Sequence, residues 1–400
     1  MIEEQQRQFE DIAPYPDSVF HEKMKHLVKE PGFEHAIKWV LPEIDYHEFC
    51  NELLQVKDKD MFQRKIMAPF LEMLAAKTTS GVSIDGLDRV DPNKAYTFIT
   101  NHRDIVLDTS FLNLCFLRVN YPTTQVAIGN NLLIYEWIND LVRLNKSFIV
   151  KRDLPRVKAL EAAKELSEYI HYTVGVENQS VWIAERQGRS KDSSDMAQDS
   201  LVKMLALGGK GGFRENIAEI NLLPVSISYE YDPNDYLKAR EFLLRRNDPE
   251  FKKTQRDDLF AMETGLLRPK GRVHFTVGCQ LSDAILSLDP EMDKSSLARE
   301  VCNIIDCQIH SGYKIFPINY VAYDQLLKTD EFASKYTAEE AREFDRYIQE
   351  QLTKVDVPEL TSDDREYLYQ MMLTMYANPL RNKLQARDHC HDYCSRIMDK

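Results

Sequence analysis

The strongest constraint on the fold is a regular alternation of strand-like and helix-like segments between about residues 86 and 285. Runs rich in β-branched and aromatic residues, which are typical of strands, recur between segments whose apolar residues repeat at helical spacing. Strands are predicted at 94–100, 123–129, 147–150, 179–185, 222–230 and 271–278, and helices at 132–144, 154–174 and 196–207. This alternation predicts an α/β fold with a mixed, largely parallel sheet covered by helices, and functional loops are expected at the strand ends.

Helical patterns dominate both ends of the chain. Apolar residues repeat at helical spacing through most of residues 1–85, and a turn rich in Gly, Asp and Pro is expected at 80–92. Helices are also predicted at 338–352 and 363–376. We therefore expect an N-terminal helical region at 1–85, an α/β domain at 86–285 and a C-terminal helical region at 286–400.

Composition and charge restrict the function classes. The 400 residues carry a net charge of −13, which argues against nucleic acid as a partner because phosphate neutralisation needs a basic surface. No apolar run approaches the roughly 20 residues that span a bilayer. The N-terminus also lacks the apolar core of a signal peptide, so a cytoplasmic location is expected.

The cysteines do not indicate a disulfide framework. Seven cysteines are scattered over the chain, and reduced thiols are expected. Zinc sites usually draw ligands from two separated pairs. The one dense cluster is His389, Cys390, His391 and Cys394, and the only other candidate ligands are Cys302, Cys307 and His310. We interpret the cluster as accidental and predict no metal site.

The segment NHRDIVLD, residues 101–108, places a histidine directly after a predicted strand and an aspartate six positions further on. On one continuous helix these two side chains would point apart, because successive residues rotate by about 100°. His102 can reach Asp108 only if the following helix begins between them, and Asp104 is a suitable N-cap for it. The pair is then a general base with its orienting carboxylate. The alternative is a solvated turn histidine and a carboxylate favoured by the helix dipole.

Two basic loops follow later predicted strands. Lys151 and Arg152 come directly after the strand at 147–150, and Arg186 and Arg189 follow the strand at 179–185. Guanidinium groups suit phosphate because they bind it bidentately and stay charged. Each loop alone could be a solvated basic turn. Together with the His102 turn, they predict a site for a phosphorylated substrate near a general base.

The order of these segments resembles the glycerolipid acyltransferase family, which includes glycerol-3-phosphate and lysophosphatidate acyltransferases. NHRDIVLD is similar to the family's first block, RLNKSFIVKR (143–152) to its second, VWIAERQGRSKD (181–192) to its third and LLPVSISYE (222–230) to its fourth. The trailing strand GRVHFTVG (271–278) also resembles the family. The likeness covers roughly residues 86–282. It implies supporting site roles for Asn101, Arg103, Glu185, Gly188 and Ser190.

Two positions depart from the family pattern. The family usually places four residues between His and Asp, whereas five lie between His102 and Asp108. In the third block, Arg186 and Gln187 separate Glu185 from Gly188, where the family usually has EGTRS or EGGRS. Substrate preference is therefore less constrained than the fold.

The resemblance implies an O-acyltransferase. His102 would take the proton from a substrate hydroxyl as the oxygen attacks an acyl thioester, and Asp108 would orient the imidazole. The acyl donor would be coenzyme A or acyl carrier protein thioester, used as a co-substrate with no separate cofactor. The acceptor would be glycerol-3-phosphate, lysophosphatidate or a related lipid precursor.

The product of such a reaction is a membrane lipid, so peripheral contact with the inner face of the membrane is expected, through basic loops and apolar residues such as Phe33 and Trp39. Leu132, Leu133, Ile134, Tyr135 and Trp137 could form an acyl groove, although helix core is the simpler interpretation. Two other functions stay open. One is a catalytically silent lipid-binding protein of the same fold, and the other is a metal-dependent phosphoester hydrolase.

Overall fold

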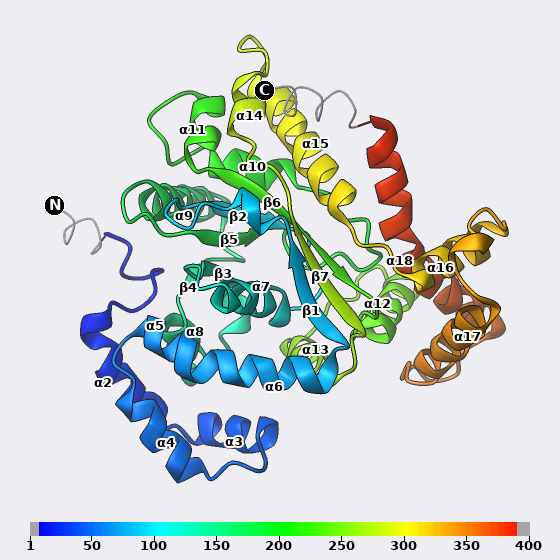
Figure 1. Cartoon of the computed structure of the whole chain (residues 1–400), viewed down its shortest axis with the longest axis horizontal. Coiled ribbons are helices and arrows are strands. Elements are labelled where there is room, and N and C mark those ends of the chain that lie inside the picture. Colours follow the sequence, from blue (N-terminus) through cyan, green and yellow to red (C-terminus); the bar gives the residue numbers. More distant parts are fainter. Residues whose placement is uncertain (1–7, 390–400) are drawn as a thin grey trace.

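A seven-stranded sheet forms the centre of the protein (Figure 1). The computed structural model describes residues 8–389. The strands are β1 (Gly81–Asp85), β2 (Thr97–Thr100), β3 (Gln125–Gly129), β4 (Ser147–Val150), β5 (Val181–Ala184), β6 (Leu222–Tyr229) and β7 (Arg272–Val277), in the order β1-β7-β6-β2-β5-β3-β4. Neighbouring strands run parallel except β6 and β7, which are antiparallel. The predicted mixed, largely parallel sheet of an α/β fold is therefore confirmed.

Helices cover both faces of this sheet (Figure 1). One face packs against α6 (Ala68–Thr78) and α7 (Leu107–Arg118). The other packs against α9 (Arg156–Gly175), α10 (Asp199–Leu205), α11 (Phe213–Glu219), α14 (Ser282–Leu286) and α15 (Lys294–Gly312). Because successive strand residues point to opposite faces, Phe98 joins the first core and its neighbour Ile99 joins the second.

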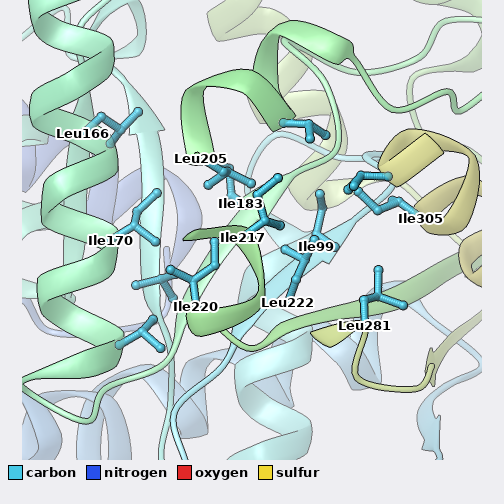
Figure 2. Packing of buried hydrophobic residues seen from close by; sticks show 14 of the residues in the cluster. Ile99, Leu166, Ile170, Ile183, Leu205, Ile217, Ile220, Leu222, Leu281 and Ile305 are labelled. Carbon is cyan, nitrogen blue, oxygen red and sulfur yellow. The ribbon is translucent and has the colours of Figure 1, made fainter. Parts of the chain in front are cut away.

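The second core is the larger and consists mainly of branched aliphatic side chains. Figure 2 shows Ile99, Ile183 and Leu222 of three adjacent strands meeting side chains from the covering helices. Fully burying one such side chain contributes about 1.5–3 kcal/mol. This dense packing fixes the positions of β2, β5 and β6, whose carboxyl ends carry two of the predicted functional loops.

Two helical groups extend the fold. The N-terminal group comprises α2 (Asp17–Leu27), α3 (Pro31–Val40), α4 (Tyr46–Gln55), α5 (Lys59–Phe62) and the short π-helix Gln63–Met67, and it packs with α8 (Glu136–Leu144). The C-terminal group comprises α16 (Pro317–Leu327), α17 (Ala338–Leu352) and α18 (Ser362–His389), which pack against α12 (Asp235–Asn247). The remaining helix is α13 (Gln255–Leu267), with 3-10 turns at Leu87–Arg89, Asn130–Leu132 and Ala333–Lys335.

Several sequence predictions of local structure differ from the fold. The expected turn at 80–92 is wrong at its start, because residues 81–85 form β1, which pairs with β7. Helices α11, α12 and α13 were not predicted, and the predicted helices at 132–144 and 196–207 begin later, at Glu136 and Asp199. The division into three domains stays a prediction.

The described cysteines correct one expectation. Cys50, Cys115, Cys279 and Cys302 carry free thiols, whereas Cys307 is disulfide-bonded. The expectation of reduced thiols is therefore wrong at Cys307. The His and Cys cluster that was interpreted as accidental lies largely outside the described residues, which end at His389 and so leave out Cys390, His391 and Cys394. Within the described part of the chain, no group of three or more His, Cys, Asp or Glu could hold a metal ion.

Candidate active site

The loop between β2 and α7 presents the predicted histidine at the carboxyl end of the sheet. Asp104 accepts hydrogen bonds from the backbone N–H groups of Val106 (2.9 Å) and Leu107 (2.8 Å). These bonds satisfy donors that the first turn of a helix leaves free, so α7 begins at Leu107. The N-cap residue of α7 is Val106, so the prediction of Asp104 as the N-cap is wrong, although its carboxylate accepts the N–H of Leu107, the first residue of the helix. As a result, Asp108 lies in the first turn of α7, next to the loop that carries His102.

His102 and Asp108 are in direct contact. Their Nδ1 and Oδ2 atoms are 2.8 Å apart, and the same oxygen accepts the backbone N–H groups of Arg103 (2.7 Å) and Asp104 (3.1 Å). Asp108 is fully buried, whereas the His102 side chain is 15% exposed. Because a carboxylate only accepts, a neutral imidazole in this contact carries its proton on Nδ1 and keeps the lone pair on Nε2.

Trp182 of β5 supports the imidazole from the side. The two rings meet edge to face, with 5.7 Å between their centroids. Both residues line a cavity of about 800 Å³. The ring contact and the Asp108 contact together limit the rotation of His102, which holds one nitrogen toward the carboxylate.

The cavity lies beside the carboxyl ends of β3, β4 and β5 and has an extensive apolar wall. Its apolar lining includes Leu132, Leu133, Val150, Leu166, Leu201, Met204 and Met262. Of the five residues predicted as an acyl groove, Leu132 and Leu133 lie in this wall. Tyr135 is exposed and stacks on Trp137, which packs instead against Phe33 of the N-terminal helices.

The same cavity is strongly cationic, although the whole chain is acidic. Seven Lys or Arg residues line it against three carboxylates, which are Asp153, Glu241 and Asp258. The cations are Lys151, Arg152, Arg186, Arg189, Lys191, Arg245 and Lys253. The four phosphate-binding candidates predicted from the sequence therefore line the same cavity as His102.

Two of the four candidates differ in how far their charge is already balanced. Lys151 forms an ion pair with Glu165 (2.9 Å). Burial lowers the pKa of Arg152, and the nearby charges of Asp153 and Asp258 only partly offset this decrease. The side chain of Arg152 also lies close to Gly129, where a Cβ would meet the guanidinium Nε at 2.7 Å.

Arg189 is the most informative cation in the cavity. Only 7% of the residue is exposed, yet its Nη1 atom has no hydrogen-bond partner among the described residues. Gly188 before it adopts a positive φ of 72°, a conformation that other residues seldom adopt. Arg186 likewise has a buried Nε without a partner in the described structure. Buried donors of this kind normally need an acceptor, so an anion is the natural complement.

Four predicted supporting residues do not line the cavity. Asn101 joins β2 to β6 through two hydrogen bonds with the backbone of Ile227 (3.0 and 2.8 Å). Arg103 is buried and paired with Asp195 at 2.6 Å. Ser190 bonds to Asp192 (3.1 Å), and Glu185 is fully buried. Gly188 is the one residue of the supporting set in the cavity wall.

Glu185 faces other buried acids. Burial, followed by the charges of Asp195 and Asp306, raises the pKa of Glu185 well above its usual range. Neither of its carboxylate oxygens has a hydrogen-bond partner among the described residues. Glu185 therefore belongs with the buried charged residues around Arg103 and Asp195 and not with the cavity.

Sequence reasoning missed Glu241, Arg245 and Lys253, which line the cavity from α12 and from the loop before α13. They lie more than 50 residues after the third predicted loop, in a segment where no helix was predicted. The basic pairs Arg245–Arg246 and Lys252–Lys253 are the only local signal. Trp182 was read only as part of a strand, although its ring supports His102.

Comparison with known proteins adds a distant likeness. No protein-family model and no curated protein matches the sequence. Among solved structures, the chain resembles the crystal structure of the 1-acyl-sn-glycerophosphate (LPA) acyltransferase PlsC from Thermotoga maritima. The TM-score is 0.35 and the identity 12%, over 72% of this chain and 95% of that chain.

Proposed function

We propose that this protein is an O-acyltransferase that moves a fatty acyl group from a thioester to a hydroxyl of a phosphate-bearing acceptor. Glycerol-3-phosphate, lysophosphatidate and related lipid precursors are the proposed acceptors. One observation carries this proposal. A histidine held by a buried carboxylate opens into a single cavity whose lining includes both apolar and cationic side chains.

The proposed mechanism needs no protein nucleophile. Nε2 of His102 accepts the proton of the acceptor hydroxyl while that oxygen attacks the thioester carbonyl. Asp108 stabilises the imidazolium that forms. When the carbon–sulfur bond breaks, the imidazolium returns the proton to the departing thiolate, so His102 ends in its initial state. Such general-base help is typically worth about 10²- to 10⁴-fold in rate.

The cationic wall would position the acceptor. Arg152, Arg186 and Arg189, with Lys151, are the proposed ligands of its phosphate, because their charged donors converge on the cavity that contains His102. Fixing the phosphate places the hydroxyl at a defined distance from the imidazole. Positioning of this kind lowers the entropic part of the barrier.

The apolar wall would hold the acyl chain. Each methylene that leaves water for an apolar environment contributes about 0.8 kcal/mol. Leu132, Leu133 and Leu166 therefore favour a long chain over acetate. We propose an acyl-coenzyme A or acyl carrier protein thioester as the co-substrate, with no further cofactor.

We also propose peripheral contact with the inner face of the membrane. No helix in the described residues is both long and apolar enough to span a bilayer. Phe33, one of the two apolar residues expected at the membrane, is only 2% exposed and packs in the N-terminal core, so its expected role is wrong. At the start of α9, Val157 and Leu160 are 73% and 65% exposed. Arg156 and Lys158 lie among them, a combination that favours anionic lipid.

Flotation with liposomes tests this contact. We expect binding to vesicles that contain anionic lipid at low salt, and loss of binding when Val157 and Leu160 are both replaced by Ser. Trp39→Ser in the N-terminal group is the comparison variant. If it removes binding while the α9 variant still floats, the contact lies on the N-terminal helices and the proposed surface is wrong.

Replacement of His102 tests the enzymatic proposal. His102→Ala should lower acyl transfer by about 10²- to 10⁴-fold, measured with labelled acyl thioesters and a panel of hydroxyl acceptors. His171→Ala is the matched control, since His171 also contacts a carboxylate, Glu219 (2.6 Å), but does not line the cavity.

The control should keep its activity and both variants should keep their fold. Unchanged transfer by His102→Ala would exclude His102 as the base. A wild-type protein that binds acyl lipid but transfers nothing would instead be the silent lipid-binding protein of the alternative interpretation.

A further inference from the structure

One cationic cluster in the cavity draws two of its three cations from outside the loops assigned to the acceptor. It is centred on Glu241 of α12, which is buried to 5% exposure. Three cations surround this single carboxylate, with N···O distances of 3.0 Å for Arg245, 3.2 Å for Lys253 and 3.4 Å for Lys191. We refer to Glu241, Lys191, Arg245 and Lys253 as the Glu241 cluster.

The Glu241 cluster has more positive charge than its own carboxylates balance. Glu241 offsets one of the three cations, and Asp258, 3.4 Å from Lys253, offsets a second. Burial lowers the pKa of Lys191 to about 8. The positive charges of Lys253 and Arg189 lower this pKa further, whereas the negative charge of Glu241 raises it. Like charges held together in this way are unfavourable until an anion joins them.

The arrangement also has the form of a binding site. Lys191 comes from the loop after β5, Arg245 from the end of α12 and Lys253 from the segment before α13, so three separate parts of the chain converge. All three side chains, and Glu241, line the cavity that contains His102. Glu241 holds each cation in place, which reduces the side-chain entropy that an incoming anion would otherwise have to remove.

We propose that the Glu241 cluster is a second anion-binding subsite, which takes a phosphate group distinct from the one held by Lys151 and Arg152. The cavity then binds two phosphate groups. This inference deepens the proposed function and rests on it for the identity of the ligand. The phosphate belongs either to the acyl donor, whose phosphopantetheine arm carries a phosphate ester, or to the acceptor, in which case Lys151 and Arg152 hold the phosphate of the donor.

Phosphate binding without turnover is the primary test. Inorganic phosphate and pyrophosphate are titrated into the full chain by calorimetry, with melting temperature as the check on folding. The double variant Lys191→Gln/Lys253→Gln lacks two charged hydrogen-bond donors of the cluster. Phosphate binding at the cluster should therefore weaken roughly 100-fold. Lys252→Gln, an exposed neighbour outside the cavity, is the matched control and should bind as the wild type does.

A second variant separates the two subsites. Arg152→Gln should remove the other phosphate site and leave the Glu241 cluster intact, so each variant should lose one of two binding events. If the double lysine variant binds phosphate with unchanged affinity and stoichiometry while folded, the second subsite does not exist. The same conclusion follows if Lys252→Gln weakens binding equally.

Steady-state kinetics identifies the source of the phosphate. A rise in KM for the acyl thioester alone in the double lysine variant assigns the cluster to the donor, and a rise for the phosphorylated acceptor alone assigns it to the acceptor. Unchanged KM values for both would overturn a substrate role. Should the wild-type protein bind two phosphates but transfer no acyl group, the proposed function fails and the anion subsite stands.

Discussion

Two groups of charged side chains arise from the same two loops, after β2 and β5, and they differ in how their charges are balanced. Arg103 from the first loop is buried and forms a 2.6 Å ion pair with Asp195, which also accepts the hydroxyl of Tyr313 (2.6 Å). Arg189 from the second loop is buried to a similar degree, yet its Nη1 has no partner in the described structure. The guanidinium of Arg103 is paired with a carboxylate within the fold, whereas Nη1 of Arg189 has no acceptor there.

This difference indicates what each group does. A buried ion pair is strongly destabilised when one partner is lost, because the remaining charge stays out of water. We call Arg103, Glu185, Asp195, Asp306 and Tyr313 the interior network. It joins the site loops to α15. Arg189 lines the cavity with His102, and no ion pair of its guanidinium is seen in the described structure. Its charge acts on the buried Asp104, but its Nη1 atom has no hydrogen-bond partner among the described residues, and a ligand can supply that acceptor.

The largest expected effect on stability therefore comes from the interior network. Asp195→Asn preserves the shape of the side chain but leaves Arg103 as an uncompensated buried charge. The free energy of unfolding should fall by about 3–5 kcal/mol, measured by urea denaturation at neutral pH.

Arg189→Met provides the contrasting variant. Removing a cation without a partner should leave the free energy of unfolding unchanged or higher, while kcat/KM for a phosphorylated acceptor falls by about 10- to 100-fold. If Arg189→Met destabilises the fold as much as Asp195→Asn does, the two arginines have the same structural role. The distinction between interior network and cavity would then be lost.

The sequence predicts much of this molecule where the signal is local. The strands and the sheet type follow from periodicity, and the contact of His102 with Asp108 follows from the position where α7 had to begin. The strand β1 was missed because residues 81–85 are flanked by turn residues, and its stability comes from pairing with β7, 191 residues further along the chain. The Glu241 cluster was missed for the same reason, since only tertiary packing brings α12 to the loop after β5.

The smallest expected effect concerns the pH dependence of the interior network. Burial, and then the charge of Asp195, raises the pKa of Asp306 to about 7, although the backbone N–H of Ala197 (2.8 Å) opposes the shift. An acid whose pKa is raised by folding binds more protons in the native state than in the unfolded state at intermediate pH. Its contribution to stability is therefore complete below its ordinary pKa of 3.8 and is lost as the pH rises through about 7.

The variant Asp306→Asn isolates this contribution. Between pH 5 and pH 6 the wild type should lose about 1 kcal/mol relative to the variant, because one additional bound proton changes the free energy of unfolding by about 1.4 kcal/mol per pH unit. The free energy of unfolding of both proteins is measured by urea denaturation at each pH. The difference between the two values is used because Glu185 lies in the same network and affects both proteins. A difference that stays constant from pH 5 to pH 8 would show that Asp306 is ionised throughout. The interior network would then carry one more negative charge, and the positive charge of Arg103 would no longer suffice to neutralise its carboxylates.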